Sequence, residues 1–292
     1  MADRGPVGFV GLKARSGAPI AQAVAEAGWP LVVWADDPTT TAALEDAPAT
    51  TAATLQDLAA ACEVVVFRDV EDDAVERLVA ELVAGMRPGG VVVNNRPRGK
   101  PSELRQWAER GRVAGVFVLD AMTSGPAGGP GGKPYRSMMV GGDRAAFERS
   151  RAILEATATS VLHMGGPGAG ELAKLFNTLV YDANVMVVAG MLELGERLGL
   201  ELEALVELIR VSSGGSYALE ALVRPDMVNG SVEEYGMDWY LSMFRGRLAD
   251  LSADARDLDI PPSRLEGWAR DGIEELPAVI DRLAPLRGED RR

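Results

Sequence analysis

Short apolar runs rich in valine alternate with longer segments of helical periodicity through the first half of the chain. The runs predict strands at residues 7–12, 31–35, 63–67, 90–95 and 115–120, with a weaker pair at 137–142 and 160–165. Between them, apolar positions recur at helical spacing in residues 18–28, 40–46, 54–61, 72–85, 100–111 and 143–158. This alternation predicts an α/β fold, a Rossmann-like doubly wound parallel sheet with helices on both faces.

Strand patterns end near residue 165, and the rest of the chain predicts only helices. Residues 168–199 predict one long helix that is apolar on nearly every face, so we expect it to be buried all round, against both domains and a partner subunit. Further helices are predicted at residues 202–213, 216–223, 238–258 and 274–285. We therefore expect a Rossmann-like domain at residues 1–164 and an all-α domain at 165–292, joined through the long interdomain helix, with a homodimer formed through the helical domain.

Charge and rare residues exclude several classes of function. A formal net charge of −13 argues against a nucleic-acid partner. The missing secretory signal and the lack of an uninterrupted apolar stretch predict a cytoplasmic protein without a membrane partner. The single Cys62 and the single His163 exclude an intramolecular disulfide and a multi-histidine metal site, and we expect both side chains to be structural.

Three glycine-bearing motifs follow one another along the chain. They are GFVGL with GAP (residues 8–12 and 17–19), LDAMTSG with MMVGG (119–125 and 138–142), and GPGAGELAKLFN (166–177). In this order and spacing they resemble the β-hydroxyacid dehydrogenase family, the relatives of 3-hydroxyisobutyrate dehydrogenase and 6-phosphogluconate dehydrogenase. The resemblance spans nearly the whole chain. It implies an oxidoreductase that transfers a hydride between NAD(P) and a small β-hydroxyacid or the related carbonyl acid.

The resemblance also assigns catalytic and substrate-binding residues. Lys174 matches the family's catalytic lysine, and Asn177 matches the asparagine one turn later. Side chains three residues apart share one face of a helix, and an amine in an interdomain cleft can pass a proton to or from a substrate hydroxyl. Ser124 and Gly125 match the residues that hold the substrate carboxylate, and Thr123 adds a hydroxyl. A solvated surface lysine and a plain loop are the alternative interpretations.

The turn after the first predicted strand departs from the dinucleotide-binding fingerprint. Two glycines can serve as its first and third members, but the middle glycine is missing and the loop is longer by one residue. Side chains in this loop would obstruct a close approach of the backbone to a pyrophosphate. We still expect the cofactor to contact this turn, through Gly11, Leu12, Lys13, Arg15, Ser16 and Gly17.

Other predicted cofactor residues follow later strands. Asp36 can accept hydrogen bonds from ribose hydroxyls and would repel a 2′-phosphate, which favours NAD over NADP. Arg68 and Arg96 follow strands at the edge where open α/β sheets bind ligands, and Asn95 ends one of these strands. Such basic residues indicate an anionic ligand held by side chains, and scattered surface charges are the alternative interpretation.

Two other functions stay open beside the oxidoreductase. A relative that has lost the standard nicotinamide site would use another anionic cofactor, such as a deazaflavin, or perform non-redox chemistry on an anionic substrate. A non-catalytic binding protein on the same fold is the third hypothesis, and the pairing of Lys174 with Asn177 argues against it. The oxidoreductase is the function that we expect.

Overall fold

The chain is described by a computed structural model, which divides it into two compact units, Met1–Lys174 and Leu175–Arg292. The residues that the structure describes are 4–13, 17–35, 49–97, 99–125, 133–223, 237–257, 261 and 264–282. The predicted cofactor residues Arg15, Ser16 and Asp36 and the predicted helix at 40–46 lie outside these ranges.

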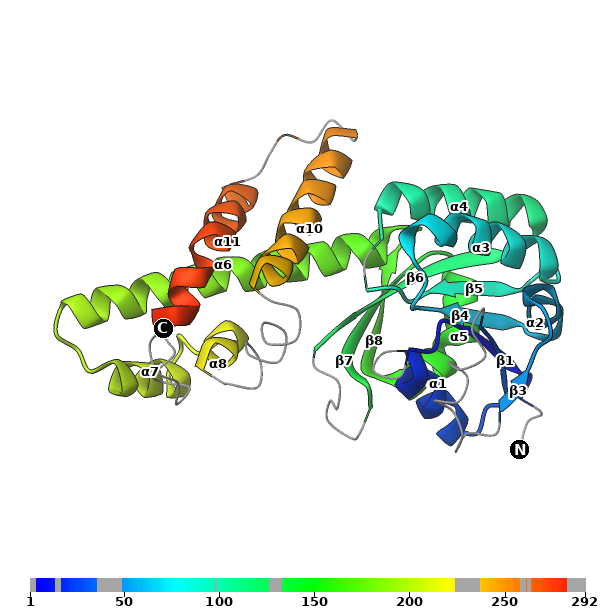
Figure 1. The fold of residues 1–292 in the computed structure, drawn as a ribbon, viewed down its shortest axis with the longest axis horizontal. Coiled ribbons are helices and arrows are strands. Elements are labelled where there is room, and N and C mark those ends of the chain that lie inside the picture. The colour runs from blue at the N-terminus through cyan, green and yellow to red at the C-terminus, as the bar shows by residue number, and fades with distance from the viewer. Residues whose placement is uncertain are drawn as a thin grey trace. The chain divides into compact units, whose positions relative to one another are not determined.

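A single sheet of eight strands forms the centre of the first unit (Figure 1). Its strands are β1 (Val7–Val10), β2 (Leu31–Trp34), β3 (Ala49–Thr51), β4 (Val64–Phe67), β5 (Val91–Asn94), β6 (Phe117–Ser124), β7 (Tyr135–Gly141) and β8 (Ala158–Gly165). Their order in the sheet is β3-β2-β1-β4-β5-β6-β7-β8. The predicted α/β doubly wound fold is confirmed.

One pairing differs from the expected parallel sheet. β7 runs antiparallel to β6, whereas the other neighbouring pairs are parallel. Parallel neighbours need a crossover of roughly a dozen residues or more, usually a helix. Only residues 125–134 join β6 to β7, so the chain can return only as a hairpin.

Helices cover both faces of the sheet and divide its core into two layers (Figure 1). One layer packs against α1 (Gly17–Glu26) and α5 (Arg144–Thr157), and the other against α2 (Leu55–Ala61), α3 (Asp72–Gly85) and α4 (Pro101–Ala114). Within β4, Val64 and Val66 face the first layer, while Val65 and Phe67 face the second. Valine-rich strands buried on both faces explain why the pattern along the chain shows continuous apolar runs.

The second unit consists of helices over its described residues. α6 (Ala169–Arg197) begins in the first unit and continues into the second, which also holds α7 (Leu202–Val211), α8 (Tyr217–Val223), α10 (Met237–Asp257) and α11 (Arg264–Arg282). An ion pair at 3.0 Å between the Arg245 Nη2 and Glu274 Oε2 atoms joins α10 to α11.

The predicted start of the last helix, at residue 274, is wrong by about three turns, because α11 begins at Arg264. Gly267 and Gly272 lower the intrinsic helix propensity of this segment. A Cβ atom added at Gly272 would overlap the side chain of Met186 on α6, so close packing of the two helices compensates for the weak propensity.

The expectation that α6 is buried all round is also wrong for the single chain. A stripe of apolar side chains along the helix is about half exposed or more: Phe176, Val180, Val187, Met191 and Leu194. By length and composition alone α6 is apolar enough to cross a membrane, a property that the sequence reasoning did not predict. Of the apolar window, 44% is buried inside the protein.

Candidate active site

The sheet reverses its winding between β1 and β4, and a crevice opens there. From β1 the chain proceeds through β2 and β3 on one side, and then returns to place β4 on the other. Open α/β sheets bind ligands at such a switch point, beyond the carboxyl ends of the strands. The residues that follow β1 and β4, from Gly11 to Lys13 and from Asp69 to Glu71, border this crevice.

A pocket of about 390 Å³ occupies the crevice and brings several of the predicted cofactor residues together. Its lining includes Gly11, Leu12 and Lys13 from the turn, and Trp34 at the end of β2. The opposite wall comes from the loop before α3 and from α3 itself, including Asp69 and Glu71.

Gly11 and Gly17 have the packing that the fingerprint assigns to its first and third glycines. Gly11 has a φ of 79°, and an added Cβ there would lie 2.6 Å from the backbone nitrogen of Asp69. An added Cβ at Gly17 would overlap the Gly11 carbonyl oxygen and lie 2.7 Å from the Asp69 Oδ2 atom. The tight turn and the close approach of α1 to β1 therefore both require glycine.

The carboxylate of Asp69 lies against the same turn. Its Oδ2 atom accepts hydrogen bonds from the backbone N–H of Lys13 at 3.1 Å and from that of Gly17 at 2.9 Å. The sequence reasoning missed Asp69. The available signal was its position, since a carboxylate two residues after β4, at a switch point, faces the turn after β1.

The predicted basic residues of the crevice have partners within the protein. Lys13 Nζ lies 3.1 Å from Glu71 Oε1, and the Arg96 guanidinium pairs with Asp72. Both carboxylates belong to the same acidic segment as Asp69. These pairs place the strand-end cations opposite an acidic loop, so their charge is at least partly balanced without any bound anion.

Arg68 reaches across the strand ends instead of into solvent. Its Nη1 atom donates to the backbone oxygen of Asn95 at 2.7 Å and to the Asn95 Oδ1 atom at 2.9 Å. The guanidinium lies 5.2 Å from the centre of the Tyr135 ring, and its buried Nε atom has no hydrogen-bond partner. Burial raises the pKa of Tyr135, while the charge of Arg68 and a hydrogen bond with Thr123 lower it. Arg68 thus connects the predicted cofactor residue Asn95 with Tyr135, the hydrogen-bond partner of the predicted substrate residue Thr123.

The predicted substrate residues end β6. Thr123 and Ser124 are half-buried, and the backbone oxygen of Ser124 accepts a hydrogen bond of 3.4 Å from the Ser137 hydroxyl on β7. Gly125 has a φ of 95°, and an added Cβ would lie 2.5 Å from the Arg136 Cβ atom. The loop therefore requires glycine at this position for its backbone conformation and for its contact with β7.

A buried carboxylate connects β6 with the start of α6. Asp120 is 1% exposed, its Oδ1 atom accepts from the Gly168 N–H at 2.9 Å, and its Oδ2 atom accepts from the Glu171 N–H at 2.9 Å. Burial raises the pKa of Asp120 to about 6, and the backbone N–H donors act in the opposite direction. A Cβ at Gly170 would lie 2.7 Å from Asp120 Oδ2, so this glycine allows the close approach. The sequence reasoning assigned no role to Asp120.

Lys174 follows this anchored turn. It is half-buried on α6 and is the last residue of the first unit, while Asn177, three residues later, is exposed. Because the contacts of Asp120 fix the first turn of α6, they also fix the backbone position from which Lys174 extends.

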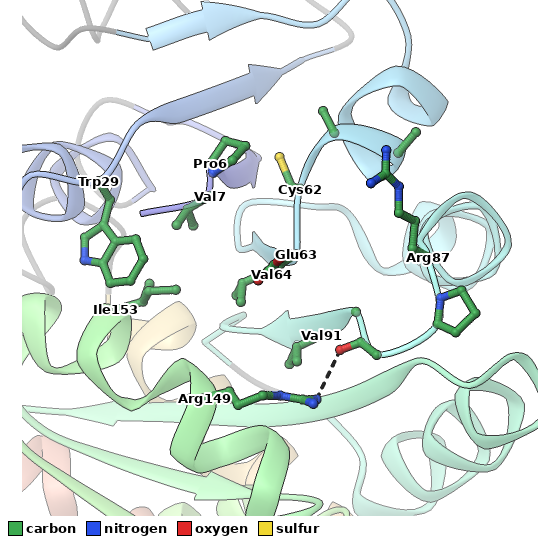
Figure 2. A pocket seen from close by; sticks show the side chains of 16 residues that line it. Pro6, Val7, Trp29, Cys62, Glu63, Val64, Arg87, Val91, Arg149 and Ile153 are labelled. Carbon is green, nitrogen blue, oxygen red and sulfur yellow. Dashed lines mark hydrogen bonds between the residues drawn. The ribbon is translucent and has the colours of Figure 1, made fainter. Parts of the chain in front are cut away.

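A larger cavity, of about 570 Å³, lies at the opposite edge of the sheet (Figure 2). Val7, Val64 and Val91, the first residues of β1, β4 and β5, line it together with Trp29 and Arg149. Since ligands of this fold bind at the carboxyl ends of the strands, and none of the predicted site residues lines this cavity, it is not the candidate site.

The single cysteine and histidine occupy structural positions, as expected. Cys62 is 5% exposed, and burial raises the pKa of its thiol to about 11. The Nε2 atom of His163 lies 2.9 Å from the Gly142 carbonyl oxygen, and the ring packs on Phe147. Among the described residues, no group of three or more His, Cys, Asp or Glu side chains is arranged to hold a metal ion.

Comparison with known proteins identifies the family. The family model for the NAD binding domain of 6-phosphogluconate dehydrogenase matches residues 6–166, and the model for the NAD-binding part of NADP-dependent 3-hydroxyisobutyrate dehydrogenase matches residues 168–237. The NAD-dependent L-serine dehydrogenase of Pseudomonas aeruginosa is 32% identical over 73% of this chain and 72% of its own length.

A probable 3-hydroxyisobutyrate dehydrogenase of Mycobacterium tuberculosis is 29% identical over 73% of this chain and 71% of its own. The solved structure of M. tuberculosis 3-hydroxyisobutyrate dehydrogenase with L-serine has the same fold, with a TM-score of 0.78, 22% identity and coverage of 96% of this chain and 99% of that one. The chain therefore belongs to the β-hydroxyacid dehydrogenase family and is an NAD(P)-dependent hydroxyacid dehydrogenase-like enzyme.

Proposed function

We propose that the enzyme interconverts a small β-hydroxyacid and the matching carbonyl acid, with Lys174 as the proton donor and acceptor. The observation that carries this proposal is the Asp120 anchor, because it fixes the turn of α6 that leads into Lys174 and ties that turn to β6, which ends in the substrate loop. NAD(P), when bound, would supply or accept the hydride. Lys174 gives a proton to, or takes one from, the substrate oxygen, and Asn177 orients the amine.

The substrate carboxylate binds, in this proposal, at the end of β6. The hydroxyls of Thr123 and Ser124 and the backbone of Gly125 form the cradle. Arg68 adds positive charge beside it, since its guanidinium stacks on Tyr135, the hydrogen-bond partner of Thr123. A small carboxylate substrate suits a site that combines two hydroxyls with the positive charge of Arg68.

The crevice between β1 and β4 fits the phosphate end of the cofactor. Two backbone N–H groups, those of Lys13 and Gly17, already converge on a single carboxylate oxygen, which is the arrangement that a phosphate oxygen needs. Gly11, Leu12, Arg15 and Ser16 would complete this end, while Asn95 and Arg96 extend along the neighbouring strand end. We propose NAD rather than NADP because Asp36, from its place in the sequence, would repel a 2′-phosphate.

The exposed stripe on α6 supports a homodimer. Phe176, Val180, Val187, Met191 and Leu194 recur at helical spacing along one face, and a face of this length and apolarity is typical of a subunit interface. We propose that two copies of the chain pair through these helical units in the cytoplasm.

The proposed function is tested by separating cofactor binding from turnover. Purified protein is titrated with NADH and with NADPH while its tryptophan fluorescence is followed, because Trp34 lines the crevice. We expect saturable quenching by NADH, and no quenching up to millimolar concentrations of either cofactor would overturn the proposal and favour another anionic cofactor.

Two substitutions of Lys174 then test its role. Lys174→Ala removes the amine, and Lys174→Arg keeps the charge but cannot release a proton at neutral pH. Both variants should lose roughly 10²–10⁴-fold in kcat while binding NADH as the parent protein does. A Lys174→Arg variant with parental kcat would remove Lys174 from proton transfer.

A further inference from the structure

The Asp69 carboxylate occupies the position at the start of α1 where the proposed cofactor needs its phosphate contacts. The two N–H groups that Asp69 binds belong to Lys13, which precedes α1, and to Gly17, which is the first residue of α1. Both donate to the same oxygen atom, Oδ2, at 3.1 and 2.9 Å. The Gly17 N–H is shared with the Lys13 carbonyl oxygen, which lies slightly farther away, at 3.1 Å.

Close packing holds Asp69 on this turn from the other side. Its backbone nitrogen would be 2.6 Å from a Cβ added at Gly11, so the loop after β4 lies directly on the first glycine of the fingerprint. The contacts of Asp69 therefore span the switch point, and both Asp69 and its partner Lys13 line the pocket of about 390 Å³.

Asp69 differs from the neighbouring acidic residues in the groups that its carboxylate contacts. Glu71 pairs with the side chain of Lys13, and Asp72 pairs with that of Arg96. Asp69 instead binds backbone amides, the groups that a dinucleotide's phosphate requires. A carboxylate and a phosphate cannot take the same two N–H groups at once, and the two anions repel each other.

We propose that Asp69 is an internal competitor for the phosphate of the cofactor, so that the cofactor binds only as the Asp69 carboxylate leaves the amides of Lys13 and Gly17. This inference rests on the proposed function for the identity of the ligand. Asp69 would then lower the affinity for the cofactor, an effect separate from that of the missing middle glycine. The wild-type chain should therefore bind dinucleotides more weakly than a chain without this carboxylate.

The experiment compares four full-length proteins: wild type, Asp69→Ala, Asp69→Asn and the control Asp73→Asn. Asp73 is an exposed acid in the first turn of α3, four residues after Asp69, so the control removes an equal charge without changing the contacts of the turn. Dissociation constants for NADH come from fluorescence quenching, and those for inorganic pyrophosphate come from the shift in melting temperature. Urea unfolding confirms that each variant is folded, and Asp69→Asn serves where Asp69→Ala is too unstable.

A hydrogen bond to a charged group is worth about 1.5–3 kcal/mol, so removal of the competitor should tighten NADH binding by roughly 10-fold or more in Asp69→Ala. Asp69→Asn, which keeps a neutral acceptor, should tighten it less, and Asp73→Asn should change it by less than about 3-fold. Equal NADH affinity in wild type and both Asp69 variants would overturn the inference while leaving the proposed function intact.

The pyrophosphate measurement separates the two proposals. If no protein binds NADH but pyrophosphate binds Asp69→Ala more tightly than wild type, the competition stands and the proposed function fails. If neither ligand binds more tightly to the Asp69 variants than to Asp73→Asn, Asp69 does not compete with an anion for the amides, and the inference fails.

Discussion

The Asp120 carboxylate accepts the backbone N–H of Gly168 at 2.9 Å, across 48 positions of the sequence. Asp120 belongs to the predicted substrate motif and Gly168 to the predicted catalytic motif, so this hydrogen bond joins the two motifs into one structure. The second carboxylate oxygen of Asp120 accepts a hydrogen bond from the Glu171 N–H. The negative charge of this carboxylate also lies at the positive end of the α6 helix dipole. The link places the start of the catalytic helix on the strand that carries the substrate loop.

Asp120→Asn should destabilise the protein. An asparagine has one acceptor oxygen, so its amide nitrogen would face one of the two N–H donors. A buried donor left without an acceptor costs about 1–3 kcal/mol, and we expect the free energy of unfolding in urea at neutral pH to fall by about that amount. Turnover should fall as well, since the turn before Lys174 loosens. Glu109→Gln, at an exposed ion pair, is the control, and an equal loss in both variants would contradict the assigned role of Asp120.

The same residue predicts a pH dependence of stability. Its carboxyl ionises near its ordinary pKa of 3.8 in the unfolded chain, and burial raises that pKa to about 6 in the folded protein. Between these values the folded state binds more protons than the unfolded state, so this group stabilises the fold as the pH falls from 6 towards 4. The total is on the order of 3 kcal/mol, and above pH 6 the contribution is constant. The contribution of Asp120 is isolated by subtracting the free energy of unfolding of Asp120→Asn from that of the wild type at each pH. A difference that does not change between about pH 4 and pH 6 would refute this prediction.

The sequence pattern predicts the sheet well because the pattern and the structure have one cause. Strands buried on both faces must be apolar throughout, and β4 and β5 match their predicted runs closely. The family's motifs likewise lead to Lys174 and Ser124, because they are defined by residue type and spacing along the chain.

Contacts between segments that are distant along the chain cannot be predicted from local patterns or motifs. Asp69 is one carboxylate of an acidic loop, and only the pairing of β4 beside β1 brings it to the amides of Lys13 and Gly17. The charges of Lys13 and Arg96 indicated an anionic ligand, but their partners in the structure are Glu71 and Asp72. Local sequence gives the charge of a residue, and the tertiary fold decides its partner.

Gly17→Ala should destabilise the protein although alanine favours helices. The added Cβ would overlap the Gly11 carbonyl oxygen, which is backbone and cannot move aside. Overpacking of this kind costs about 1–3 kcal/mol in the free energy of unfolding, more than the gain of about 1 kcal/mol from helix propensity. Gly246→Ala on α10 is the matched control, because nothing lies within 4 Å of its added Cβ, and it should stabilise the protein. Changes of the same sign in both variants would contradict the packing argument.

Cys62 should resist thiol reagents in the native protein. Burial raises its pKa to about 11, so at pH 8 only about one molecule in a thousand carries the reactive thiolate. The side chain is also 5% exposed, although it borders the cavity of Figure 2. We expect labelling by Ellman's reagent to be at least roughly 100-fold slower than for the protein unfolded in guanidinium. Rapid native labelling would show that reagents reach the thiol through that cavity.

The α6 stripe gives a prediction about assembly. Val187 and Met191 are 61% and 53% exposed in the single chain, and burying such side chains against a second copy is worth about 1.5–3 kcal/mol each. Val187→Glu and Met191→Lys should therefore convert the proposed dimer to a monomer, as measured by sedimentation equilibrium over a range of protein concentrations. Glu275→Lys, an exposed change on α11, should leave the mass unchanged. A wild-type chain that sediments as a monomer would refute the proposed interface. Dimers that persist in both stripe variants would place the interface on another surface.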